Sequence, residues 1–68
     1  MLLSARNKLP GVVESVELDG LSAKVTLRVG DNHLVAMVTA EAVTEMHLKP
    51  GDAVSAVIKS SSVMLAKA

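Results

Sequence analysis

Alternation of apolar and polar residues on both sides of an Asp-Gly pair constrains the fold of this chain more than any other feature. Residues 11–18 and 21–29 each alternate, the first run after Val13. A period of two is the pattern of a β-strand with one buried face. The pair between the runs, Asp19-Gly20, is the strongest short-range signal of a β-hairpin. The sequence therefore predicts that the two runs pair as antiparallel strands.

After this hairpin, the pattern predicts one more strand and then a change of period. Residues 30–32, Gly-Asp-Asn, form a second turn, and residues 33–38 are apolar enough for a strand buried on both faces. Thr39 can cap a helix with its hydroxyl, and the apolar residues within 40–48 fit a short helix. Pro50 disfavours helical conformation in the residue before it, so we expect the helix to end there.

The C-terminal third of the chain predicts two further strands. Residues 53–59 form the fourth strand, residues 60–62 a tight polar link, and residues 63–66 a short fifth strand. The order is that of a five-stranded OB-type barrel, in which one short helix lies between strands 3 and 4. We therefore expect an all-β fold in which residues 1–68 form a single OB-like domain.

The composition favours self-association. The chain has 68 residues, half of them hydrophobic, and no cysteine. A domain of this size buries only about 60% of its unfolded surface, and small domains usually need disulfides, a metal or partners for stability. Disulfides are excluded here, and the apolar content exceeds what one small core requires. We therefore expect a homo-oligomer whose copies cover each other's apolar surface.

Charge and residue types argue against several classes of function. Seven basic residues balance seven acidic ones, and Phe, Tyr and Trp are absent, so neither a positive field nor stacking faces would attract nucleic acid. There is no run of about 20 apolar residues and no secretion signal, which predicts a cytoplasmic protein without membrane contact. His33 and His47 are separated and lack cysteine support for a metal site. No nucleophile and base form a catalytic set, so we expect no enzyme.

Two clusters of hydrogen-bond donors could together bind an oxyanion. The first precedes the first strand and consists of Ser4, Ala5, Arg6 and Asn7. The second follows the fourth strand and consists of Lys59, Ser60, Ser61 and Ser62. Neither cluster contains an acid, and backbone N–H groups in such a link can form an anion-binding nest. Taken separately, the first cluster is typical of a solvated chain end and the second of an ordinary turn.

At their observed separation, the two clusters resemble those of the molbindins, the small molybdate-binding Mop proteins also called molybdenum-pterin-binding proteins. The resemblance runs from about Leu3 to Ala66. It implies an OB-type fold, a homohexamer built as a trimer of dimers, and molybdate or tungstate bound as an oxyanion at subunit interfaces. It implies neither an organic cofactor nor a direct protein ligand to the metal. No DNA-binding or ATPase domain is attached here, so we expect the free-standing form that stores molybdenum in the cell.

By position, the resemblance also implies which residues bind the oxyanion: Ser4, Ala5, Arg6, Asn7, Lys59, Ser60 and Ser61. Many relatives have threonine where this chain has Ser61, and the serine retains the hydroxyl group. Many also have an acid where this chain has Ser62, and the serine lacks its negative charge. Two alternatives stay open. One is an OB-fold module that binds nucleic acid or protein. The other is a purely structural oligomerisation domain, in which Arg6 and Lys59 pair with acids across an interface.

Overall fold

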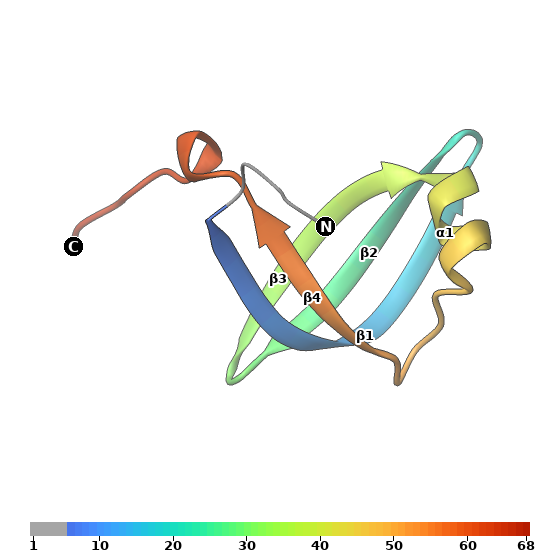
Figure 1. Ribbon diagram of the computed structural model, residues 1–68, viewed down its shortest axis with the longest axis horizontal. Helices are drawn as coiled ribbons and strands as arrows, with labels where there is room; N and C mark the ends of the chain where they lie inside the picture. The colour runs from blue at the N-terminus through green and yellow to red at the C-terminus, as the bar shows by residue number, and fades with distance from the viewer. Residues whose placement is uncertain (1–5) are drawn as a thin grey trace.

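The predicted hairpin forms the centre of the sheet in the computed structural model, which describes residues 6–68. Strands β1 (Asn7–Asp19) and β2 (Ser22–Val29) pair antiparallel around the Asp-Gly turn, where Gly20 has a φ of 62° that favours glycine. Strand β3 (Asn32–Thr39) follows β2, and β4 (Ala53–Ile58) lies on the other side of β1. The described chain therefore has one four-stranded antiparallel sheet in the order β3-β2-β1-β4 (Figure 1).

Strand β1 curls the sheet because its two halves have different partners. Residues 7–12 pair with β4, whereas residues 12–19 pair with β2. A register shift between Val13 and Ser15 is a β-bulge, which bends the strand where the partners change. Pro10 lies in the half that has no partner on its β2 side, where a missing N–H group is tolerated. As a result, the edge strands β3 and β4 border the same concave face of a half-barrel (Figure 1).

Helix α1 (Ala40–Met46) follows β3 in the chain and precedes β4. The Thr39 hydroxyl accepts a hydrogen bond from the Ala42 N–H at 3.0 Å, as expected of a helix N-cap. The helix ends at Met46, earlier than the sequence predicted, because His47 adopts the left-handed conformation with a φ of 52°. Val43 is the buried residue of this helix and packs into the core. No helix in the described part of the chain is long and apolar enough to span a bilayer.

The core is small, entirely aliphatic and located on the concave face of the sheet. Ala23, Val25 and Leu27 of β2 are buried on one face, as the alternation predicted. Leu21, which the same pattern placed with them, lies in the turn and is 90% exposed. Within residues 6–68 the buried residues number six, and all of them are hydrophobic: Val13, Ala23, Val25, Leu27, Val43 and Ala56.

The prediction that the third strand is buried on both faces is wrong. In β3, half-buried residues alternate with exposed ones, and Val35 and Met37 remain 55% and 68% exposed. The reason is that β3 is an edge strand of a single curled sheet, and no second layer from residues 6–68 covers its outer face. The strand therefore presents an uncovered apolar row.

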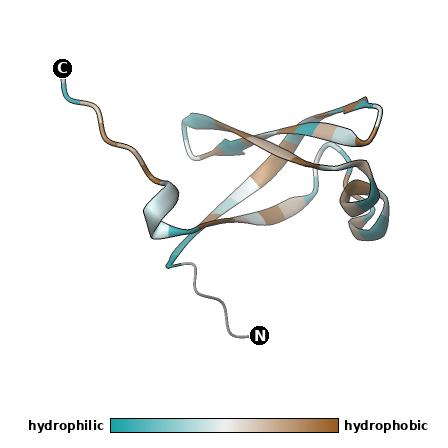
Figure 2. Cartoon of the chain, turned by 90° about the horizontal axis from the view of Figure 1, so that it is seen from above, coloured by the Kyte–Doolittle hydropathy of each residue, from teal (hydrophilic) through white to brown (hydrophobic). Residues whose placement is uncertain are grey.

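The predicted fifth strand is also absent. Strand β4 ends at Ile58, and a 3-10 turn, η1 (Ser60–Ser62), follows. Residues 63–66 then lead away from the sheet without pairing with it (Figures 1 and 2). The Ser62 N–H donates to the Lys59 carbonyl at 2.8 Å, and this turn directs the chain outward. A β-strand needs a neighbouring strand to accept and donate its backbone hydrogen bonds. The apolar pattern of residues 63–66 does not show whether such a neighbour is present.

Gly11 lies where β1 passes close to the end of β2, and we expect Gly11→Ala to destabilise the chain by about 1–3 kcal/mol. A Cβ atom at this position would lie 2.8 Å from the Arg28 carbonyl oxygen and 3.0 Å from Cγ2 of Val29. The nearer neighbour is backbone, so rotation of a side chain cannot relieve the clash. Urea denaturation followed by circular dichroism measures the loss. An unchanged midpoint would mean that the two strands separate more easily than this contact indicates.

Candidate functional site

The pairing of β1 with β4 brings the two donor clusters together. Asn7 at the start of β1 pairs with Ile58 at the end of β4, and its Nδ2 donates to the Ile58 carbonyl at 3.3 Å. The two residues are 51 positions apart in the sequence. Arg6 directly precedes this last pair in the chain, and Lys59 directly follows it. A guanidinium and an ammonium group therefore extend from neighbouring chain segments at one end of the sheet.

The hydroxyl-bearing residues of the second cluster lie in η1. Lys59 precedes this turn, and its carbonyl accepts from the Ser62 N–H. The first N–H groups of any helical turn have no partner within it, so those of Ser60 and Ser61 remain available as donors. Both serines are exposed, as is Lys59. The turn thus adds hydroxyl and backbone donors directly beside the two cations.

No carboxylate neutralises these cations within residues 6–68. Arg6 and Lys59 take part in none of the ion pairs of that part of the chain, which join His33 to Glu14 at 2.5 Å and Lys49 to Asp52 at 3.6 Å. The arrangement is therefore a group of donors and positive charges without an acceptor. Chemically, it can bind a small anion with several oxygens.

The sequence-predicted site residues divide into three groups. Arg6, Lys59, Ser60 and Ser61 come together at the exposed end of the sheet. Asn7 lies there as well, but it is half-buried. Its side-chain amide donates a hydrogen bond to the Ile58 carbonyl and so links β1 to β4. Ser4 and Ala5 lie outside the described residues. The sequence did not indicate the role of Asn7 in fixing the strand ends, because that role depends on which strand becomes its neighbour.

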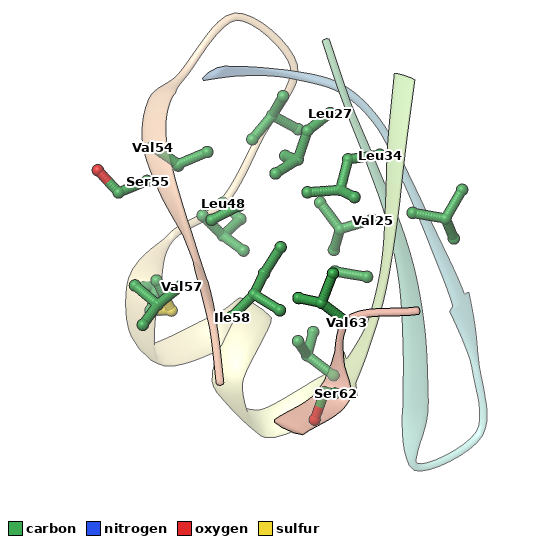
Figure 3. A pocket seen from close by; sticks show the side chains of 16 residues that line it. Val25, Leu27, Leu34, Leu48, Val54, Ser55, Val57, Ile58, Ser62 and Val63 are labelled. Atoms are coloured by element: carbon green, nitrogen blue, oxygen red, sulfur yellow. The ribbon is translucent and has the colours of Figure 1, made fainter. Parts of the chain in front are cut away.

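A larger feature that the sequence did not predict is an apolar groove of about 540 Å³ on the concave face. Its walls come from β3 and β4, and Val25 and Leu27 of β2 lie between them (Figure 3). Ser62 and Val63 border one end, so the groove and the donor cluster meet at η1. Its aliphatic lining cannot solvate an anion. The groove is therefore a separate feature from the donor cluster.

The histidines do not form a second centre. The exposed His33 ring contacts Glu14, whereas His47 ends α1. No group of three or more potential ligands among His, Asp and Glu could hold a metal ion in the described range. This leaves the donor cluster as the candidate site for binding.

Comparisons with known proteins identify related chains. A family model described as the TOBE domain matches residues 3–65. The molybdenum-pterin-binding protein MopA of Rhodobacter capsulatus is 46% identical over 67 residues, which make up 97% of this chain and 25% of MopA. The chain thus spans about a quarter of the length of MopA, and the same holds for its homologue MopB.

Two solved structures extend the comparison to three dimensions. A molybdate-binding protein from Sporomusa ovata superposes with a TM-score of 0.94 at 33% identity, covering 98% of this chain and all of that one. ModG, described as a cytoplasmic molybdate-binding protein and solved with molybdate bound, has a TM-score of 0.88 at 48% identity. That match covers 94% of this chain and 46% of ModG. The curled all-β sheet with one helix is therefore an arrangement shared with proteins that bind molybdate.

Proposed function

Because this chain belongs to the TOBE domain family, in agreement with the molbindin resemblance of its sequence, we propose that it binds molybdate or tungstate. The observation that supports the proposal is the β1–β4 register, whose last pair, Asn7 with Ile58, is flanked in the chain by Arg6 on one strand and by Lys59 and the serines of η1 on the other. We propose the same role for Ser4, Ala5 and Asn7, which flank Arg6 in the sequence. The binding would serve intracellular storage of molybdenum.

The chemistry of the cluster suits a tetrahedral dianion. One guanidinium and one ammonium group balance two negative charges, and the planar fork of Arg6 can donate to two oxygens at once. The hydroxyl and N–H groups of Ser60 and Ser61 supply further donors for the remaining oxygens. Sulfate has the same charge and shape, so discrimination must come from the larger size of the metal oxyanion. No organic cofactor is needed for this binding.

The exposure of the cluster supports a site between subunits. Arg6, Lys59, Ser60 and Ser61 are all exposed in the single chain, and an anion held there would compete with water. A second copy covering the cluster would exclude that water and strengthen each charged hydrogen bond. We propose that this copy belongs to a homohexamer, a trimer of dimers, in the cytoplasm. The sheet, helix and site would then form an OB-like unit completed by assembly.

Thermal melting of the wild type and of Arg6→Ala tests the proposal. An anion that binds only the folded assembly stabilises it by about 2.7 kcal/mol when its free concentration is a hundredfold above Kd. Molybdate and tungstate should therefore raise the wild-type Tm, and sulfate at equal ionic strength should raise it much less. Arg6→Ala should remove most of the rise. Arg28→Ala is the matched control, because Arg28 is exposed on β2, away from the cluster.

Two results would contradict the proposal in different ways. Equal shifts with molybdate and sulfate would indicate general anion screening. A ligand-free Arg6→Ala that melts earlier than the wild type, with no molybdate response in either protein, would indicate the structural alternative. In that case Arg6 would pair with an acid across an interface.

A further inference from the structure

The acidic and basic residues of the chain are distributed unevenly over the fold. All seven acidic residues lie within residues 14–52, where three basic residues accompany them. The part in which β1 pairs with β4, together with η1, consists of residues 6–13 and 53–62, and it holds three basic residues and no acidic one. The chain has no net charge, yet this part is positive and the rest is negative. A dianion is therefore attracted to one end of the molecule.

Several of the acidic residues lie toward the α1 end. Glu17 and Asp19 belong to the last residues of β1, and the turn that follows holds the start of α1 through the Leu21 carbonyl. Glu41 and Glu45 are exposed on α1 itself. The start of β1 and the end of β4 lie together at the other end of the sheet (Figure 1). The separation of charge therefore runs from α1 to the donor cluster.

Two of the three cations at the positive end, Arg6 and Lys59, belong to the donor cluster, and the third is Lys8. Lys8 is exposed in β1 and pairs with Val57, one position along from the last β1–β4 pair. Lys59 continues β4 in extended conformation, with a φ of −66° and a ψ of 134°. Two residues of a strand span about 7 Å and neighbouring strands lie about 5 Å apart, so the backbone of Lys8 lies within roughly 10 Å of both other cations.

The charge of Lys8 has no acidic partner in the described part of the chain. Neither ion pair of residues 6–68 includes it. The nearest acid along β1 is Glu14, separated by about 20 Å of extended chain, and Glu14 contacts His33. Strand β4, the partner of this half of β1, contains no charged residue. The ammonium group of Lys8 can therefore act on an anion nearby.

We propose that Lys8 attracts the oxyanion to the donor cluster through its charge, without contacting the anion. This inference rests on the proposed anion binding. Arg6 and Lys59 already balance the two charges of a dianion, and Lys8 lies within the strand and not at η1. The third cation leaves the cluster positive after binding, and this surplus favours dianions over the chloride of the surrounding solution.

A charge that acts without contact has an effect that depends on ionic strength. The screening length is about 30 Å at 0.01 M salt and about 3 Å at 1 M. At a separation of about 8 Å, Lys8 therefore attracts a dianion at the lower concentration and is screened from it at the higher one. We expect Lys8→Gln to raise the Kd for molybdate about three- to fivefold at 0.01 M and less than about 1.5-fold at 1 M.

Isothermal titration calorimetry with molybdate, at ionic strengths set with sodium chloride, tests the proposal. Lys8→Arg retains the charge and should bind as the wild type does. Lys24→Gln is the matched control, because Lys24 is exposed on β2 between Glu17 and Met37, in the negative part of the fold. It removes the same charge at a greater distance from the cluster, and should raise Kd by less than about 1.5-fold at either concentration.

Four results would overturn the role of Lys8 while wild-type binding stands. Unchanged affinity in Lys8→Gln would show that its charge has no effect, and equal losses in Lys8→Gln and Lys24→Gln would show that total charge governs binding. A loss that persists at 1 M salt would show that Lys8 contacts the anion. An equal loss in Lys8→Arg would show that side-chain shape and not charge matters. Absence of molybdate binding in the wild type would instead contradict the proposed function, and this inference with it.

Discussion

Replacing Lys59 by glutamate is expected to weaken molybdate binding by at least about a hundredfold in Kd without unfolding the chain. Lys59 directly precedes η1 and follows the last β1–β4 pair, so at the proposed site the substitution would remove a donor and place a negative charge against a dianion. The residue is exposed and caps no helix through its side chain, so the fold tolerates the change. Isothermal titration calorimetry with molybdate measures the loss.

Lys24→Glu is the matched control for this experiment. Lys24 is exposed on β2, and its replacement changes the net charge by the same amount. Equal losses in the two variants would show that the overall field of the protein, and not the cluster at Lys59, governs binding. Full affinity in Lys59→Glu would place the anion elsewhere on the molecule.

Leu27→Ala is expected to lower the free energy of unfolding by about 2–5 kcal/mol. The side chain is 5% exposed in the middle of the core, and the six buried residues offer few neighbours that could collapse into the cavity. A domain has about 5–15 kcal/mol in total, so the loss would be a large share of the stability of this chain. Urea denaturation at one fixed protein concentration measures the change, because the proposed assembly would contribute to the apparent stability.

The control for the core is Leu21→Ala. Leu21 belongs to the same alternating run but is 90% exposed in the turn, so its truncation should change stability by less than about 0.5 kcal/mol. A loss as large as that of Leu27→Ala would show that a partner covers Leu21 in solution. The comparison therefore also tests whether the exposure of Leu21 in the single chain holds in solution.

Local signals were sufficient for the parts of the fold that depend on neighbouring residues. The alternation and the Asp19-Gly20 pair predicted the central hairpin, and the Thr39 hydroxyl predicted the start of α1. The first strand begins four residues earlier than expected, at Asn7, and includes Pro10. Proline is usually a sign against a strand, but here it lies on a half-strand without a second partner. Whether proline is tolerated at this position depends on the order of the strands in the sheet, and the local sequence does not predict that order.

The predictions that failed depend on contacts between distant segments. Residues 63–66 have the pattern of a strand and a strand-like start, yet no strand of the described chain lies beside them. Residues 33–38 are apolar on both faces, but only one face is covered. In both cases the apolar pattern correctly marks residues that avoid water. It does not say whether the covering surface comes from the same chain.

The candidate site was predictable in composition but not in geometry. A guanidinium, an ammonium group and several hydroxyls without an acid predict anion binding from residue type alone. Their proximity arises from the pairing of residues 7–12 with β4, across most of the length of the chain. Only the resemblance to a known family linked the two clusters in advance. The Asn7 contact that fixes the strand ends had no signal in the sequence.

The division of β1 between two partners has a kinetic consequence. The pairs β1–β2 and β2–β3 join segments that are adjacent in the sequence, whereas β1–β4 closes a loop that contains β2, β3 and α1. Closing long loops slows folding, so we expect the two hairpins to form first and the β1–β4 pair to form last. The proposed anion site would form only after that final step. A bound oxyanion would therefore stabilise contacts that the transition state lacks, slowing unfolding while leaving the folding rate unchanged.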